Sequence, residues 1–200
     1  GYTVLALDGD GWTTVLGAHG GRPGAVVAAG TGSVGEALRA DGSRVCISGW
    51  GWVSGDEGSG AWLGLKAIRH TQAVLDGRAV GGSLAKAVGR VVGTEREALL
   101  AWNAAAGQHG YAGLAPLVFE QAEADPVAAT FVAEAVAELE TLALALDPQG
   151  QLPLALSGSI ALRLAPYFSD TIRARCVSPQ GDSADGALHL VRGELQRLGF

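Results

Sequence analysis

The segment Gly49–Gly60, GWGWVSGDEGSG, combines residue types that suit contact with a small ligand. It holds two of the five tryptophans of the chain, together with five glycines and the acidic pair Asp56 and Glu57. Glycine permits positive φ and the close approach of a ligand, and tryptophan offers a flat apolar face with a polar N–H. Carboxylates accept charge-assisted hydrogen bonds, which are the stronger kind. The segment is therefore a candidate binding loop.

A glycine-rich stretch with two hydroxyl side chains, Gly30–Ser33, directly follows an apolar, strand-like run. With Gly35 it completes the G-x-G-x-x-G pattern of dinucleotide-binding folds, in which Asp56 falls near the place of a ribose-binding acid. That fold needs a crossover helix of about 10–12 residues or more before the next parallel strand, whereas only about eight residues separate Ser33 from the turn at Asp41-Gly42. The spacing favours a hairpin, so a nicotinamide enzyme is the runner-up interpretation.

A hairpin at these residues would expose backbone N–H groups beside the hydroxyls of Thr31 and Ser33. Backbone and hydroxyl donors of this kind bind phosphate oxygens. Taken alone, the tetrapeptide fits a plain tight hairpin equally well.

The composition predicts one large domain, or one lobe of a larger protein, with a sizeable core. The chain has 200 residues, 48% of them hydrophobic. A net charge of −6 argues against nucleic-acid binding, and no apolar run of about 18 residues suggests a membrane span. Cys46 and Cys176 lie far apart in apolar runs, so we expect buried free thiols rather than a metal or iron–sulfur site, and a cytoplasmic location.

The hydrophobic patterns predict an α/β chain in which a helical block interrupts the strands. Asp125 is expected to cap the helix that begins at Pro126, and Asp182 is expected to cap the last helix. The expected strands are residues 3–8, 24–30, 44–48, 171–177 and the stretch 151–159, which ends in a small-residue turn. The expected helices are residues 11–19, 62–75, 83–92, 95–106, 111–124, 126–146, 160–168 and 184–198.

Five segments, in chain order, carry a resemblance to a known family. They are DGWTTVLGAHGGRPG (10–24), GAVVAAGTGS (24–33), GWGWVSGDEGSGAWLGLKAI (49–68), LALSGSIALRLAP (154–166) and CVSPQGDSADGALHLV (176–191). This order resembles the N-acetylglucosamine and glucosamine kinases of the BadF/BadG/BcrA/BcrD-type ATPase family, and G-W-G-x-x-x-G-D-E-G-S is its most specific part. The resemblance implies a ribonuclease-H-like (actin-like ATPase) lobe with a mixed sheet and an inserted helical block.

The resemblance implies that the tryptophan loop holds an amino sugar. Gly49, Trp50, Gly51 and Asp56 would be its contacts, while Glu57 would serve the structure or a water-mediated metal contact. Asp56 precedes a predicted helix, and the dipole of that helix would favour the ionised carboxylate. The plainer alternative is that Asp56 or Glu57 only caps the helix. Trp52 and Trp62 are expected to pack rather than to bind the ligand.

The resemblance also implies a catalytic base and an ATP site. Asp10 would take the proton from the attacking hydroxyl, with Asp8 as its competitor and a helix cap as the plainer role of Asp10. Gly30, Thr31, Gly32 and Ser33 would face the ATP β- and γ-phosphates, and Mg²⁺ would accompany the nucleotide. The turn Ser157, Gly158, Ser159 would contact the adenosine.

The chain is expected to be the C-terminal lobe of a two-lobed kinase, because members of the family carry another lobe before this one. The absence of methionine and the start within the strand-like run GYTVLAL agree with a fragment, and we expect residues 1–200 alone to be inactive. The expected partners are an amino sugar and ATP, with no nucleic acid and no membrane. A homodimer through the helical block 83–146 is an option that the resemblance leaves open.

Two further functions on the same fold stay open at this point. One is an ATPase that activates a partner enzyme, as the 2-hydroxyacyl-CoA dehydratase activators do, although the two cysteines lack the Cys-x-x-Cys spacing of a cluster site. The other is a non-catalytic sugar sensor that binds sugar without using Asp10.

Overall fold

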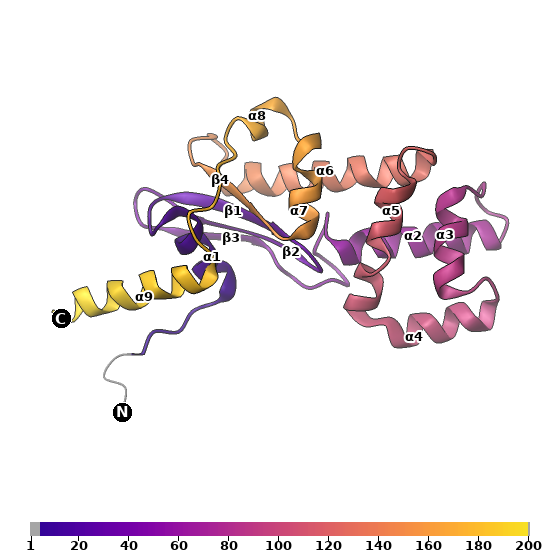
Figure 1. Cartoon of the computed structure of the whole chain (residues 1–200), viewed down its shortest axis with the longest axis horizontal. Coiled ribbons are helices and arrows are strands. Elements are labelled where there is room, and N and C mark those ends of the chain that lie inside the picture. Colours follow the sequence, from indigo (N-terminus) through magenta and orange to yellow (C-terminus); the bar gives the residue numbers. More distant parts are fainter. Residues whose placement is uncertain (1–4, 200) are drawn as a thin grey trace. The chain divides into compact units, whose positions relative to one another are not determined.

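A computed structural model describes residues 5–199, which divide into two compact units (Figure 1). Among the described residues, the first unit comprises 5–28, 34–49 and 140–199, and the second comprises 29–33 and 50–139. The first unit contains the sheet and the second is largely helical, which agrees with the expected α/β class and its helical block.

The sheet of the first unit is mixed. Its strands are β1 (Gly24–Ala29), β2 (Ser33–Leu38), β3 (Arg44–Ser48) and β4 (Leu154–Ser157), and within residues 5–199 they follow the order β3-β2-β1-β4. β1 pairs in parallel with β4, and β2 pairs antiparallel with β3. Parallel neighbours need a crossover of a dozen or more residues, so the three-residue link between the adjacent strands β1 and β2 makes them a hairpin. This confirms the hairpin that the spacing predicted.

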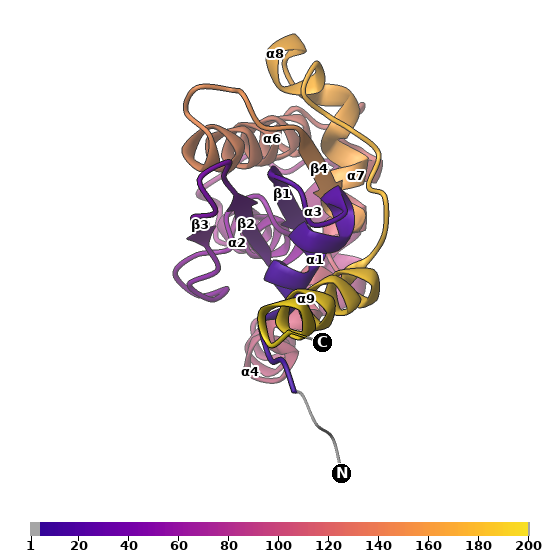
Figure 2. The same ribbon diagram turned by 90° about the vertical axis from the view of Figure 1, so that its left-hand side faces the viewer.

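Helices cover both faces of this sheet (Figure 2). On one face lie α1 (Asp10–His19) and α9 (Ser183–Arg197), and on the other lie the last turns of α6 (Pro126–Leu146). The core beneath α1 joins apolar side chains of α1, β1 and β4, namely Trp12, Val15, Leu16, Ala18, Val26 and Ala155. On the opposite face Leu146 of α6 packs directly over Gly35 of β2. The small residues of β2 therefore let α6 approach the sheet closely.

Helices α1 and α9 pack against each other at two glycines. A Cβ atom built on Gly186 would overlap the carbonyl oxygen of Thr13, and one built on Gly17 would overlap the carbonyl oxygen of Asp182. Asp182 caps α9 as predicted, since its Oδ1 accepts hydrogen bonds from Ala184 N–H at 2.8 Å and Asp185 N–H at 3.1 Å. The two glycines therefore allow the backbone at the start of α9 to contact the backbone of α1.

The second unit is a helical block. It contains α2 (Gly60–Leu75), α3 (Ser83–Val92), α4 (Arg96–Ala112), α5 (Ala115–Gln121) and most of α6. Asp125 caps α6 as predicted, because its Oδ1 accepts from Val127 N–H at 2.9 Å. Its Oδ2 accepts from Leu84 N–H at 2.8 Å, so the same carboxylate also ties α3 to α6.

Helix α4 is broken near its C-terminal end. Gly107 has φ 54° and ψ −173°, which is not a helical conformation. The sequence patterns predicted helices over 95–106 and from 111 onward, so this break falls where the first expected helix ends. Gly107 is required there because residues with a side chain rarely adopt this conformation.

Two of the expected strands differ from the structure. The expected strand 171–177 is wrong, because α8 (Asp170–Arg173) occupies its first half and only an isolated bridge pairs Cys176 with Leu154. The spacing of Ile172 and Cys176 fits a helical turn as well as a strand, and the short helix buries Ile172. Of the expected strand 3–8, residues 3 and 4 lie outside the described residues, and residues 5–8 have no regular structure.

The remaining elements of the first unit are α7 (Ser159–Leu164) and a 3₁₀ helix (Ala165–Tyr167), in place of the single helix expected over 160–168. Both cysteines are free thiols, as expected, but Cys46 is exposed and Cys176 is half-buried. Cys46 is exposed because β3 is an edge strand of the sheet.

No helix within residues 5–199 is long and apolar enough to cross a membrane.

Candidate functional site

The structure brings the hairpin turn Gly30–Ser33 and Asp56 together within the second unit. A Cβ atom on Gly32 would lie 2.6 Å from Asp56 Oδ2, so only glycine allows the turn to approach the carboxylate so closely. The backbone N–H of Ser33 donates a hydrogen bond to Asp56. The residues expected to bind phosphate are therefore in direct contact with the carboxylate expected to bind sugar.

The turn is fixed in place by the start of α2. Gly60 N–H donates to Gly30 O at 2.8 Å, and Ala61 N–H donates to Thr31 O at 3.1 Å. These bonds satisfy backbone donors that the first turn of a helix otherwise leaves unpaired. The helix cap itself is Ser59, whose Oγ accepts from Trp62 N–H, so the alternative that Asp56 or Glu57 caps this helix is wrong.

This docking leaves some donors of the turn open. Within residues 5–199, the N–H groups of Thr31 and Gly32 and the hydroxyl of Thr31 make no hydrogen bond. The Ser33 hydroxyl is already used, because it donates to Glu57 O at 2.7 Å. The open donors of the turn are thus the N–H groups of Thr31 and Gly32 and the Thr31 hydroxyl. Backbone N–H and hydroxyl groups of this kind bind phosphate oxygens.

Asp56 is buried, with only 6% of its surface exposed. Desolvation raises the pKa of its carboxyl group, and the hydrogen bonds from Ser33 N–H and the Gln108 side chain only partly offset this effect. The expectation that the helix dipole favours the ionised form is therefore not met, because burial dominates. Asp56 also has φ 58°, a left-handed conformation that Asp and Asn tolerate better than most residues.

The two tryptophans of the binding loop are placed differently. Trp50 is 84% exposed and lies between Gly49 with φ 74° and Gly51 with φ 99°. Trp52 packs on Tyr111 with 4.9 Å between the ring centroids. Trp52 therefore packs as predicted, while Trp50 leaves its apolar face available.

Asp8 and Asp10 of the first unit have different environments. Arg44 donates two hydrogen bonds to Asp8, from Nη1 at 2.7 Å and Nη2 at 2.8 Å, and this interaction lowers the pKa of Asp8. Asp10 is exposed at the first position of α1, and among the described residues its carboxylate accepts a hydrogen bond only from Gly11 N–H, at 2.9 Å to Oδ1. The cap position is Gly9, so Asp10 does not cap α1. Asp10 is thus the carboxylate that is open to a ligand.

Glu36 is a neighbour of these carboxylates that the sequence did not single out. It lies on β2, and its Oε1 occupies the space that a Cβ on Gly11 would fill. Desolvation raises the pKa of Glu36, Arg44 lowers it, and the charges of Asp8 and Asp10 raise it further. The alternation along β2 was the available signal, since it places Glu36 on the same face as Leu38, which packs against α1.

The predicted adenosine turn lies at the end of β4. Ser157 ends the strand, Gly158 has φ 87°, and Ser159 starts α7. A cavity of about 220 Å³ adjoins Ser157 within the first unit. Its other lining residues are Thr14, Ala18, Val26, Ala155, Leu156, Pro179, Gly181, Asp182 and Ser183.

In the part of the chain that the structure describes, no group of three or more His, Cys, Asp or Glu side chains is arranged to hold a metal ion. The expected phosphate donors and Asp56 form one cluster in the second unit, while Asp10 and the turn Ser157–Ser159 belong to the first unit.

Sequence reasoning missed Gln108 as well as Glu36. The side chain of Gln108 donates a hydrogen bond to Asp56.

The chain resembles three proteins that are described as amino-sugar kinases. It is 31% identical over 188 residues to the glucosamine kinase GspK of Vibrio cholerae serotype O1, covering 94% of this chain and 64% of that protein. A candidate N-acetylglucosamine kinase from Chromobacterium violaceum is 50% identical, with a TM-score of 0.87, covering 91% of this chain and 64% of that one. A second such candidate, from Porphyromonas gingivalis, is 22% identical with a TM-score of 0.67 over 90% of this chain and 64% of that one, which supports the fold alone.

These similarities confirm the expected actin-like α/β fold. The chain spans 64% of the length of each of the three relatives. Residues 4–188 match the sequence profile of one family, and this match covers most of the chain. The chain belongs to the BadF/BadG/BcrA/BcrD ATPase family.

Proposed function

We propose that this chain is the C-terminal lobe of a two-lobed kinase that transfers phosphate from ATP to an amino sugar, either glucosamine or N-acetylglucosamine. Membership of an ATPase family supports the use of ATP. Two relatives are described as a glucosamine kinase and a candidate N-acetylglucosamine kinase, which supports the substrate class. The chain spans 64% of each of them, which supports a further lobe.

The observation that carries the proposal is the contact between the Gly30–Ser33 turn and Asp56. A kinase must hold the transferred phosphate next to the acceptor hydroxyl, because phosphoryl transfer depends mainly on positioning and on charge stabilisation. Open backbone donors on Thr31 and Gly32 lie beside the buried carboxylate of Asp56. Such a pair of neighbouring groups suits a phosphate on one side and sugar hydroxyls on the other.

In the proposed reaction Asp10 is the general base. Its carboxylate takes the proton from one sugar hydroxyl as the oxygen of that hydroxyl attacks the γ-phosphorus, and ADP leaves with the electrons of the broken P–O bond. Its exposure supports this role, whereas Asp8 is occupied by Arg44. The proposal requires that Asp10 reach the sugar in the full-length protein.

The remaining contacts are assigned by the resemblance. Gly49, Trp50 and Gly51 would hold the sugar, with the exposed face of Trp50 against the ring. Ser157, Gly158 and Ser159 would contact the adenosine, and a cavity of about 220 Å³ adjoins Ser157. Mg²⁺ would accompany the ATP and neutralise the charge of its phosphates.

The test is to measure ADP release by the full-length protein with Mg-ATP. The sugars are glucosamine, N-acetylglucosamine, glucose and N-acetylmannosamine, with one reaction that contains no sugar. We expect release that depends on glucosamine or N-acetylglucosamine. Equal release in every reaction, including the one without sugar, would overturn the sugar-kinase proposal and favour an ATPase that activates a partner enzyme.

A further inference from the structure

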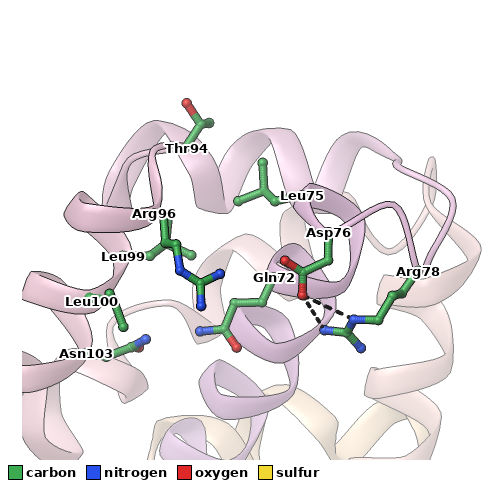
Figure 3. Close-up of a pocket in the computed structure, with 9 residues that line it drawn as sticks. All are labelled: Gln72, Leu75, Asp76, Arg78, Thr94, Arg96, Leu99, Leu100 and Asn103. Carbon is green, nitrogen blue, oxygen red and sulfur yellow. Dashed lines mark hydrogen bonds and ion pairs between the residues drawn. The ribbon is translucent and has the colours of Figure 1, made fainter.

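The second unit contains a cavity of about 490 Å³ that has no part in the proposed kinase site (Figure 3). It lies between the C-terminal end of α2 and the first half of α4. Its lining residues are Gln72, Leu75, Asp76, Arg78, Thr94, Arg96, Leu99, Leu100 and Asn103. None of them was assigned to sugar or ATP. The volume lies within the range of about 300–1,000 Å³ that is typical of small-molecule sites.

The lining follows helical spacing. Arg96, Leu99, Leu100 and Asn103 stand at positions i, i+3, i+4 and i+7 of α4, so they share one face of that helix. From α2 come Gln72 and Leu75, followed at the helix end by Asp76. Because α2 and α4 pack against each other, the wall of the cavity is built from regular helices rather than from a loop alone.

One side of the cavity offers hydrogen-bond donors. The Arg96 guanidinium points into the cavity beside the side chain of Gln72 (Figure 3), and within residues 5–199 Arg96 forms no ion pair. Asn103 lies on the same side. Tyr111 O–H donates to Asn103 Oδ1 at 3.1 Å, which fixes the amide and leaves its Nδ2 as a donor. An unpaired guanidinium and a fixed amide N–H together suit an oxyanion.

The other side offers an acceptor. Arg78 donates from Nε at 3.1 Å and from Nη2 at 2.9 Å to the same oxygen, Asp76 Oδ2. The second oxygen of Asp76 is therefore left to accept from a hydroxyl or amino group of a ligand. Leu99 and Leu100 supply apolar surface from α4, so a carbon skeleton could lie between the two polar ends.

We infer that this cavity binds a small phosphate monoester that carries hydroxyl or amino groups, with its phosphate at Arg96 and Asn103 and its hydroxyl or amino group at Asp76. A phosphate group presents three acceptor oxygens, whereas a carboxylate presents two. Two helices supply the side chains of Arg96, Asn103 and Gln72. Together these side chains carry more N–H donors than a carboxylate can accept. The two arginines and one aspartate also give the cavity a net positive charge.

The test measures binding calorimetrically with the full-length protein, without ATP, so that it does not depend on kinase turnover. The probes are glucose 6-phosphate, inorganic phosphate, glucose and citrate. Glucose 6-phosphate is expected to bind, and Arg96→Gln is expected to weaken it by about tenfold or more through loss of a charge-assisted contact. The matched control is Arg90→Gln, which removes an exposed arginine of α3 that does not line the cavity, and it should leave binding unchanged.

A second variant separates the two ends of the cavity. Asp76→Asn should weaken glucose 6-phosphate more than inorganic phosphate, because only glucose 6-phosphate has sugar hydroxyls that could donate to Asp76 while its phosphate lies at Arg96. Circular dichroism should show that each variant stays folded. The inference is overturned if glucose 6-phosphate does not bind, if Arg96→Gln binds it as tightly as the wild type, or if citrate binds while the phosphate monoester does not.

Discussion

Gln108 donates a side-chain hydrogen bond to Asp56 across 3.0 Å, and it is the first residue after the break in α4 at Gly107. The two partners are 52 residues apart in sequence. Gly107, with φ 54° and ψ −173°, sets the direction in which the chain continues and so the position from which Gln108 reaches the carboxylate. The conformation of Gly107 therefore helps to position the hydrogen bond from Gln108 to Asp56, the candidate sugar-binding residue.

Replacing Gly107 by alanine should destabilise the second unit and displace Gln108. The conformation is accessible almost only to glycine, so strain of about 1–3 kcal/mol is expected even though a Cβ there would meet no other atom. The free energy of unfolding, measured in urea, checks the first effect, and the KM for the sugar should rise if Gln108 orients Asp56. The matched control is Gly193→Ala within α9, where a Cβ also meets nothing and should be neutral or slightly stabilising.

Replacing Asp56 by asparagine should weaken sugar binding without destabilising the fold. The pKa of Asp56 is higher in the folded protein than in the unfolded chain. The carboxyl group therefore contributes its full stabilisation at pH values below its pKa in the unfolded chain. This stabilisation is lost as the pH rises through its pKa in the folded protein. Asparagine avoids this loss, keeps a carbonyl acceptor for Ser33 N–H and tolerates φ 58°. Asp56→Asn should therefore gain stability relative to the wild type as the pH rises from 4 towards 8.

Thermal unfolding of the two proteins across that pH range checks this expectation. A variant that is less stable by the same amount at every pH would show that lost hydrogen bonds, rather than the buried charge, decide the effect. The sugar KM should rise in the variant under the same conditions.

Local patterns were sufficient to predict much of the fold. The short distance from Ser33 to Asp41 predicted the hairpin, and the Asp-Pro pair at Asp125 predicted the cap of α6, because turns and caps depend on a few adjacent residues. The expected helices 95–106 and 111–124 left a gap that includes Gly107, where α4 is broken. The expected strand 171–177 was wrong because the spacing of its few apolar residues fits both a strand and a helical turn.

The environment of the site could not be predicted in the same way. The contact between Gln108 and Asp56 depends on how α4 packs on α2, which adjacent residues do not reveal. The raised pKa of Asp56 depends on burial by distant segments. An argument from the helix dipole alone therefore predicted a pKa shift in the wrong direction. Cys46 is exposed because β3 lies at the sheet edge, a property of the whole sheet rather than of the strand.

Replacing Asp125 by alanine should cost about 2–3 kcal/mol of folding free energy, because buried N–H groups of both α3 and α6 lose their acceptor. Burial alone would raise the pKa of Asp125, but bonds from Leu84, Val127 and Ala128 outweigh it and lower the pKa. Its stabilisation is therefore present above the unfolded pKa and is lost as the pH falls through the folded pKa. Urea unfolding at pH 7 checks the cost.

The control for that variant is Asp125→Asn, which keeps an oxygen for capping but loses the charge. It should retain part of the stability and show a weaker decline in acid than the wild type. Equal stability of the alanine variant and the wild type would show that water satisfies these donors.

Replacing Asp10 by asparagine in the full-length protein should lower the kcat for sugar-dependent ADP release by about 10²–10⁴-fold, which is the range expected for loss of a general base. The KM for the sugar should change little, because Asp10 is assigned to proton transfer rather than to binding. Steady-state kinetics with the preferred sugar check both values.

Asp8→Asn is the matched variant, since it makes the same chemical change two residues away. It weakens the pair with Arg44, and partly exposed pairs of this kind contribute only about 0–1 kcal/mol. Its kcat should fall less than tenfold, with a small loss of thermal stability. If Asp8→Asn instead loses most of its kcat while Asp10→Asn stays active, Asp8 is the base, and its bond to Arg44 must open in the working enzyme.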